Sequence, residues 1–181
     1  FPEMEVSRMD ADTVSAVNTH EKILERFQKE NIPVLIGTQM VAKGLNLPDV
    51  TVVGVLDSDL SLYTDSFRAA ETTFNMLTQV VGRAGRGDSP GLAVIQTLQP
   101  EHQVIRLAAK QDYDSFYRSE IELRKFQYCP PFADVLTLTA SALDESLVLC
   151  CCAYIRDLLK DKLSHRKDIR ILGPAPLPVV R

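Results

Sequence analysis

A short segment of glycines and arginines has the clearest capacity for chemistry in this 181-residue sequence. Gln79 precedes Gly82-Arg83 and Gly85-Arg86, and four of the chain's eight glycines lie between residues 82 and 91. A guanidinium group stays charged, is planar and can hold phosphoryl oxygens with two parallel hydrogen bonds. An arginine that stabilises the transition state of phosphoryl transfer contributes a factor of about 10³–10⁵ in rate. The segment therefore indicates an arginine pair directed at phosphate, with a solvated glycine-rich turn as the alternative.

A dinucleotide-binding loop is rejected for the same segment. Residues 82–87 read G-x-x-G-x-G and follow a predicted helix. The dinucleotide fingerprint reads G-x-G-x-x-G and follows a strand.

The elements around this segment predict an α/β fold. The runs at 34–36 and 50–56 are apolar on both faces, as buried parallel strands are. Helices are predicted over residues 18–30, 66–81, 101–109, 112–127 and 144–163, and further strands at 5–7, 92–97, 135–140 and 169–172.

Small polar residues follow two of these strands. Gly37-Thr38-Gln39 comes after the first and Asp57-Ser58-Asp59 after the second. Open α/β sheets bind ligands at the carboxyl ends of their strands, although loops often begin with polar residues. Asp57, Asp59 and Asp65 form an acidic cluster, and a structural role is favoured because no histidine or nucleophile accompanies it.

Composition bounds the class of protein. The net charge of −4 argues against a protein that coats nucleic acid, but it does not exclude a local basic site. No apolar run approaches the roughly 20 residues of a membrane helix. The cysteines are Cys129 and Cys150-Cys151-Cys152, without a Cys-x-x-Cys pair. We expect no metal site in this chain, small apolar fillers on a helix, and a reducing cytoplasmic setting.

Three further features are interpreted as structural or solvated. The stretch 160–170 carries five basic and two acidic residues, and a solvated helix end is favoured over a contact with DNA phosphates. Arg68 and Glu71 are three residues apart on a predicted helix and are spaced to pair. The histidines are expected to be inert on helix surfaces: His20, His102 and His165.

Several longer strings resemble a known family. Gly37-Thr38-Gln39, Lys43-Gly44-Leu45-Asn46 and Q-x-x-G-R-x-G-R at 79–86 resemble motifs V and VI of the superfamily 2 helicases. The strings at 37–44, 56–59, 67–71 and 78–86 narrow the resemblance to the primosomal replication-restart helicases. Strings at 7–13 and 130–174 extend it over essentially the whole chain.

The resemblance implies an incomplete RecA-like helicase lobe with a parallel sheet, followed by a partial α+β C-terminal domain. It places the second RecA-like lobe, with motifs V and VI, at residues 1–98 and a helical connector at 99–129. Residues 130–181 are expected to begin the C-terminal domain after Pro130-Pro131. We expect this truncated part to be mobile or to pair with a neighbouring chain.

The resemblance also assigns nucleotide contacts. Arg83 and Arg86 are expected to reach the γ-phosphate, with Gln79 hydrogen-bonding nearby. Gly44 and Asn46 are expected beside the nucleotide. Related helicases often have Asp where Asn46 stands. Asn keeps an oxygen acceptor at that position but lacks the negative charge of Asp.

DNA contacts follow from the same resemblance. Thr38 is expected to touch a DNA phosphate, a contact that positions a strand without reading its sequence. Gln39 and Lys43 are weaker candidates, and Lys43 is equally well explained as a solvated lysine.

The cofactors implied are ATP and Mg²⁺, bound mainly by a first lobe. The chain contains neither G-x-x-x-x-G-K-[ST] nor Asp-Glu-x-His, so we expect it not to hydrolyse ATP alone. The resemblance places a zinc module upstream of Phe1.

The function implied is ATP-driven DNA unwinding in the restart of stalled replication forks. The partners implied are branched and single-stranded DNA, single-strand-binding protein and primosome components, with no membrane. Two alternatives remain: a RecG-like fork-remodelling helicase, and a non-catalytic module that docks partner proteins. The docking module predicts that loss of Arg86 leaves function intact.

Overall fold

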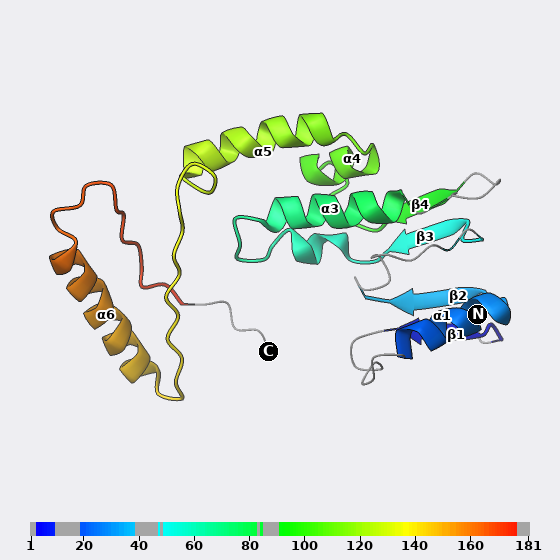
Figure 1. The fold of residues 1–181 in the computed structure, drawn as a ribbon, viewed down its shortest axis with the longest axis horizontal. Coiled ribbons are helices and arrows are strands. Elements are labelled where there is room, and N and C mark those ends of the chain that lie inside the picture. The colour runs from blue at the N-terminus through cyan, green and yellow to red at the C-terminus, as the bar shows by residue number, and fades with distance from the viewer. Residues whose placement is uncertain are drawn as a thin grey trace. The chain divides into compact units, whose positions relative to one another are not determined.

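The computed structural model describes residues 3–9, 19–38, 47, 49–82, 84 and 91–176. The chain divides into two compact units, residues 1–127 and 128–181, and Figure 1 traces the elements in order. The strands are β1 (Val6–Met9), β2 (Val34–Gly37), β3 (Val52–Val55) and β4 (Leu92–Ile95). The helices are α1 (Thr19–Lys29), the 3₁₀ helix η1 (Ser58–Ser61), α3 (Ala69–Val81), α4 (Gln103–Ala109), α5 (Tyr113–Gln127) and α6 (Glu145–Lys162). The α/β prediction is confirmed.

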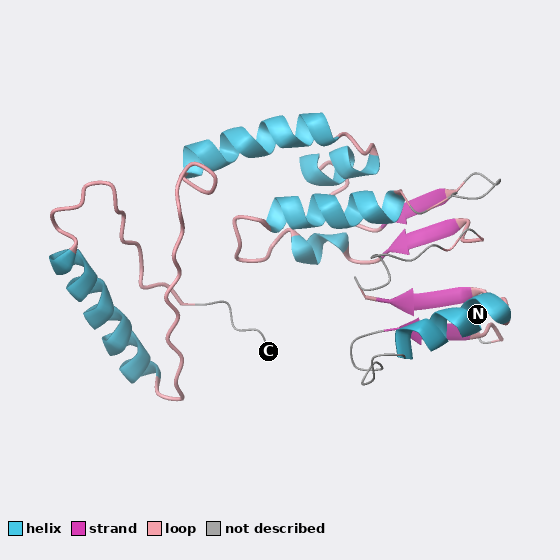
Figure 2. Cartoon of the chain, viewed as in Figure 1, coloured by secondary structure: helices cyan, strands magenta, loops and turns pink. Residues whose placement is uncertain are grey.

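The strands form two parallel pairs. β1 pairs with β2 from Val6↔Val34 to Met9↔Gly37. β3 pairs with β4 in a second two-stranded sheet, from Val52↔Leu92 onward, and Figure 2 shows β3 and β4 pointing the same way. The predicted parallel pairing is therefore present, within two short sheets.

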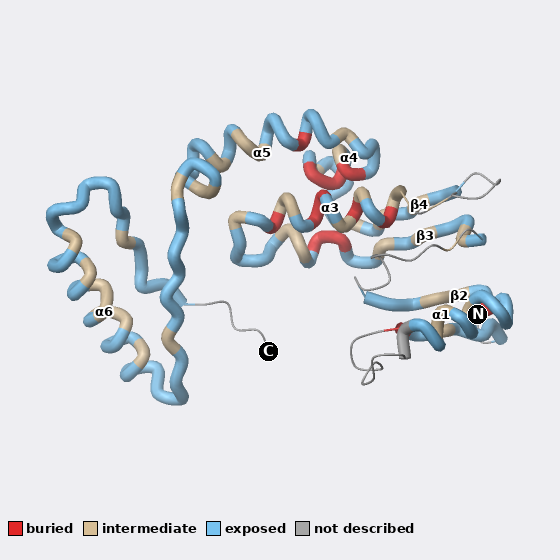
Figure 3. Tube along the Cα trace, viewed as in Figure 1, coloured by how far each residue is buried: buried red, intermediate tan, exposed pale blue. Residues whose placement is uncertain are grey.

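The main core lies between α3, α4 and α5. Figure 3 shows buried residues gathered on α3 and α4, and the rings of Phe74 and Phe116 stack with centroids 4.1 Å apart. Val55 and Ile95, near the ends of β3 and β4, pack against this cluster. Its buried members are Phe74, Leu77, Val104, Ile105, Ala108 and Phe116. Helices α4 and α5, which the sequence predicts as a connector, thus contribute to the core of the first unit.

The β3–β4 sheet is covered on one face among the described residues. Val52 is 60% exposed and Val94 50%, and a Cβ added to Gly54 would meet nothing within 4 Å. The prediction of burial on both faces is wrong for these residues, because α3 packs on one side and no described element covers the other.

Local hydrogen bonds set several helix ends. Helix α1 is followed by a turn at Asn31, whose φ of 50° is left-handed, and the Ile32 N–H donates to the Phe27 carbonyl at 3.1 Å. This turn confirms the predicted stop. Helix α4 begins at His102, whose Nδ1 accepts from the Val104 N–H at 3.3 Å. The His102 ring therefore has a structural role as a helix cap, which the sequence analysis did not predict.

The described part of the second unit, residues 128–176, contains one regular element. Helix α6 starts at the predicted residue, since Asp144 Oδ1 accepts from the Ser146 N–H at 2.9 Å. The strands predicted at 135–140 and 169–172 are absent from the described residues, which are drawn as loop in Figure 2. Alternation of apolar residues did not suffice, because a strand also needs a hydrogen-bonding partner.

No described residue of the second unit is buried. Cys150 and Cys151 are exposed on α6, so the prediction of buried fillers is wrong for both. The extended segments beside the helix provide no second packed face for these side chains. Within the described chain, no helix is both long and apolar enough to cross a membrane.

Candidate functional site

Helix α3 points from the carboxyl ends of β3 and β4 toward their amino ends. It runs antiparallel to both strands (Figure 1), and the chain after Gly82 leads on to β4. At the amino ends of the two strands, the Leu92 N–H donates to the Thr51 carbonyl at 2.8 Å. The glycine–arginine segment therefore connects α3 to the amino end of β4.

Gln79 is exposed near the end of α3. The helix closes at Gly82, whose N–H donates to the Thr78 carbonyl at 3.0 Å. The Thr78 hydroxyl in turn donates to the Phe74 carbonyl at 2.7 Å. Arg83 and Arg86, the predicted phosphate ligands, lie outside the described residues.

Thr38 follows the last residue of β2 and is exposed, where a phosphate can reach its hydroxyl. The neighbouring predicted contacts lie outside the described residues: Gln39, Lys43, Gly44 and Asn46. The described chain resumes at Leu47, whose carbonyl accepts from the Val50 N–H at 3.3 Å. The segment that resembles motif V therefore leads into the amino end of β3.

The polar residues at the carboxyl ends of β3 and β4 serve the fold. The Asp59 carboxylate accepts from the Leu98 N–H and the Thr97 hydroxyl, both at 2.8 Å. The Leu98 N–H, and then the Thr97 hydroxyl, lower the pKa of Asp59, because both favour its charged form. Asp59 is 6% exposed. The structural interpretation of Asp59 is confirmed, and the expectation of a ligand at this end of β3 is not supported.

No group of three or more His, Cys, Asp or Glu residues that could hold a metal ion occurs among the described residues.

A half-buried arginine joins α3 to α5. Arg124 donates to Glu120 and to Glu71, each at 2.8 Å, and its side chain is only 14% exposed. Glu71 therefore pairs with α5, and the predicted pair with Arg68 is wrong: the Arg68 guanidinium lies over Phe67, 5.4 Å from the ring centroid. Packing between helices outweighed the three-residue spacing within one helix.

A shallow apolar groove runs between the turn before α3 and helices α4 and α5. Its lining includes Leu62, Phe67, Phe116 and Leu123. Of the predicted nucleotide and DNA residues that the structure describes, neither Gln79 nor Thr38 lines it.

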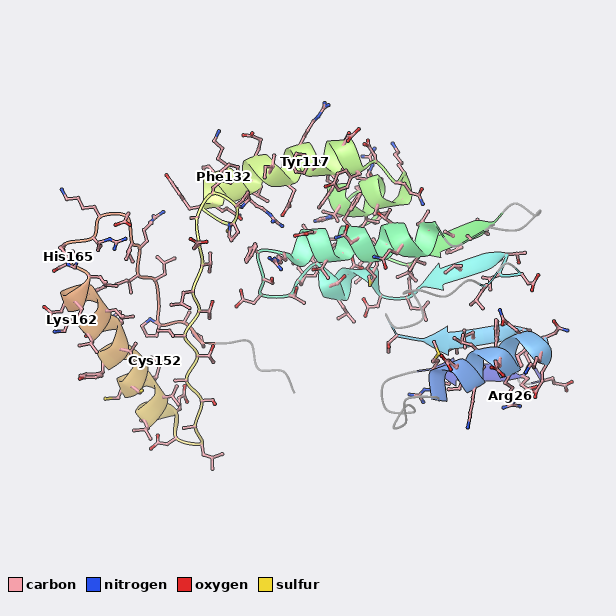
Figure 4. All side chains as sticks on the ribbon, in the orientation of Figure 1. Arg26, Tyr117, Phe132, Cys152, Lys162 and His165 are labelled. Carbon is pink, nitrogen blue, oxygen red and sulfur yellow. The ribbon has the colours of Figure 1, made fainter. Side chains whose placement is uncertain are left out.

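The basic stretch of the second unit is partly neutralised. Arg166 donates to both carboxylate oxygens of Asp168, at 2.9 and 2.6 Å, and these bonds lower the pKa of Asp168 to about 2. The Arg170 guanidinium lies over the Tyr128 ring, 5.3 Å from its centroid. Figure 4 shows Lys162 and His165 at the end of α6. The stretch matches the solvated helix end that the sequence favoured.

Two residues make tertiary contacts that the sequence does not predict. Arg124 follows Glu120 by four residues, a spacing that indicates the pair within α5 but not its link to α3. Gln111 has a left-handed φ of 55°, and its amide nitrogen lies 3.2 Å from the position that a Cβ on Gly82 would take. Nothing in the sequence around Gln111 indicates that contact.

Comparison with known proteins supports the resemblance to helicases. The family described as "Helicase conserved C-terminal domain" matches residues 3–88, a range that includes motifs V and VI. Over all 181 residues the chain is 42% identical to "Replication restart protein PriA" of Bacillus subtilis. It is 38% identical over the same length to the protein of that name in Synechocystis, and 35% identical over 175 residues to that of Rickettsia conorii.

The chain spans only part of these relatives. It covers 22% of the Bacillus subtilis and Synechocystis proteins and 26% of the Rickettsia conorii protein. The similarity thus covers nearly all of this chain and about a quarter of each relative.

Proposed function

The chain belongs to the family of the replication restart proteins named PriA, and we propose that it forms the second motor lobe of an ATP-dependent DNA helicase that restarts stalled replication forks. The observation that carries the proposal is the placement of motif VI. Gln79 is exposed on the last turns of α3, and the helix closes at Gly82, directly before Arg83. The helicase family match covers this segment.

In this proposal the arginines act on the phosphates of ATP. Closure of the two lobes brings Arg83 and Arg86 to the γ-phosphate, where their planar guanidinium groups neutralise the charge that spreads over its oxygens. Gln79 hydrogen-bonds beside them, and Gly44 and Asn46 flank the nucleotide. ATP and Mg²⁺ are held mainly by a first lobe, so this chain alone does not hydrolyse ATP.

DNA is held through its backbone. Thr38, at the exposed end of β2, contacts a phosphate, and Gln39 and Lys43 assist it. Lobe opening after hydrolysis moves this contact along one strand. Contacts to phosphate carry no sequence information, so binding follows DNA structure and weakens with salt.

The proposed setting is a primosome. Branched and single-stranded DNA are the substrates, single-strand-binding protein and primosome components are the protein partners, and a zinc module precedes this lobe. The relatives' shared name, replication restart protein, supports this setting.

Substitution of Arg86 tests the proposal in the intact protein. Arg86→Lys keeps a positive charge but loses the bidentate geometry, so DNA-stimulated ATP hydrolysis is expected to fall by about 10³-fold. Binding of ATP and of forked DNA is expected to stay nearly unchanged. Arg118→Lys, an exposed arginine on α5, serves as the control with full activity.

Unchanged turnover in Arg86→Lys would reject the arginine assignment. The glycine–arginine segment would then be a solvated turn, and the non-catalytic docking module would be the better account of the chain.

A further inference from the structure

The turn between α4 and α5 holds Gln111 in a backbone conformation that glutamine rarely adopts. The Gln111 N–H donates to the Ala108 carbonyl at 3.0 Å and the Asp112 N–H to the Leu107 carbonyl at 2.9 Å. This is the Schellman pattern, in which the residue at the position of Gln111 is usually glycine. Gln111 has a left-handed φ of 55°, which costs conformational free energy in a residue with a Cβ. A glutamine at this position therefore calls for a compensating role of its side chain.

The side chain of Gln111 packs on the end of α3. Its amide nitrogen lies 3.2 Å from the position that a Cβ on Gly82 would take, and the Thr78 carbonyl oxygen lies equally close to that position. The bare Cα of Gly82 therefore makes room for the Gln111 amide. Because Gln111 is otherwise exposed, its removal leaves no buried cavity.

Gly82 is where the chain leaves α3. Its N–H still caps the helix by donating to Thr78, and the next residue is Arg83. On the other side of the contact, Ala108 is fully buried and Ile105 nearly so, so α4 is anchored in the core. The turn that carries Gln111 is therefore held in place by the core, and it lies beside Gly82, the residue that caps the end of α3.

We propose that Gln111 is a positioning residue that sets the direction in which the chain leaves α3, and thereby orients Arg83 and Arg86. The proposal rests on the function proposed for those arginines. Gln111 lies outside the residues matched by the helicase family, 3–88, so this support is an addition to the general helicase lobe.

The test replaces Gln111 with glycine in the intact protein. Glycine adopts the left-handed turn more readily, so Gln111→Gly is expected to keep or raise the thermal unfolding temperature. Loss of the side chain is expected to lower kcat for DNA-stimulated ATP hydrolysis about tenfold, because small misplacements of catalytic groups have effects of this order. The KM for ATP is expected to change by less than about twofold, since the arginines act on the transition state.

Asn31→Gly is the matched control. Asn31 occupies the same kind of left-handed turn at the end of α1, with a φ of 50° and an exposed side chain. Asn31→Gly is likewise expected to keep or raise the thermal unfolding temperature, but without a change in kcat. Equal loss of activity in both variants would overturn the positioning role.

A second measurement tests the contact itself. Gly82→Ala places a Cβ 3.2 Å from the Gln111 amide and is expected to lower kcat in the wild-type background. In the Gln111→Gly background most of this effect is expected to disappear, because the two changes act on one contact. Additive effects would overturn the proposal.

Arg86→Lys in the same assay separates the two proposals. If Arg86→Lys loses activity while Gln111→Gly keeps the wild-type rate, the positioning role is wrong and the proposed function stands. If neither variant changes the rate, the proposed function fails, and the positioning role fails with it.

Discussion

Helices α3 and α6 have comparable local signals but very different surroundings. Helix α3 has 13 residues, of which Ala69, Thr73, Phe74, Leu77 and Val80 are buried. Helix α6 is longer, at 18 residues, and has a well-formed cap at Asp144, yet none of its residues is buried. Periodicity predicts both helices, although only α6 has a side-chain cap at its N-terminus. Burial required a second packed element, which α4 provides for α3 and no described element provides for α6.

The same difference holds for the charged side chains of the two units. Arg124, in the first unit, is 14% exposed and joins two helices. Arg166, in the second, is 51% exposed and pairs with a residue only two positions away. The ion pair of Arg124 in the first unit therefore joins two helices. The ion pair of Arg166 in the second unit joins two residues of the same turn.

The largest expected effect is on the free energy of unfolding, and it is tested by replacing one leucine in each helix. Leu77 is fully buried in α3, whereas Leu147 in α6 is 61% exposed. Leu77→Ala is expected to lower the free energy of unfolding by about 3 kcal/mol, from lost transfer energy and a residual cavity. Leu147→Ala is expected to change it by less than about 0.5 kcal/mol. Urea unfolding of the chain, followed by circular dichroism, measures both, and equal losses would contradict the comparison.

A smaller effect is expected from the arginines. Arg124→Ala leaves the carboxylate of Glu120, 12% exposed, without this donor, and is expected to lower the free energy of unfolding by about 2 kcal/mol. Arg166→Ala is expected to have no measurable effect, because exposed ion pairs are screened by water and salt. The same urea titration measures both variants. A loss in Arg166→Ala as large as that in Arg124→Ala would show that the second unit also depends on its ion pair.

The smallest effect is a pH dependence at the carboxyl edge of the first unit. The pKa of Asp59 is lowered in the folded state, so its stabilisation is complete above the ordinary pKa of about 3.9. It is lost as pH falls through the lower folded pKa. The stability difference between wild type and Asp59→Asn is therefore expected to be constant near neutral pH and to shrink in acid. Unfolding free energies measured over a pH series test this.

Thr97→Val sharpens the same test. It removes the hydroxyl that donates to Asp59 at 2.8 Å, so the folded pKa of Asp59 moves back toward its ordinary value. The total loss of stability in acid is therefore expected to be smaller than in wild type and to be complete at a higher pH. An acid response of Thr97→Val identical to wild type would contradict a contribution from this hydrogen bond.

Local features of the fold were predictable because they depend on neighbours within about one helical turn. The stop of α1 at Asn31, the start of α6 after Asp144 and the apolar stripe of α3 all follow from capping and periodicity. The strands expected at 135–140 and 169–172 failed for the complementary reason. Their hydrogen bonds need a partner strand, which an alternating pattern does not supply.

The family was predictable from the sequence, whereas the surroundings of the motif strings were not. The strings at 37–44 and 79–86 indicate the family. The polar residues after the strands favour a ligand at their carboxyl ends, but at β3 and β4 that edge is tied by Asp59 to Thr97 and Leu98. Helix α3 points toward the amino ends of β3 and β4, because its direction opposes theirs.

By itself, the sequence determined the α/β class, the positions of the helices and the motifs that place the chain in a helicase family. Only the tertiary structure decided which distant side chains meet. Arg124 reaches Glu71 across 53 positions, and Gln111 reaches Gly82 from a turn in another helical pair. The physical reason is range: capping and periodicity act over a few residues, whereas these contacts exist only after the core of α3, α4 and α5 has brought the helices together.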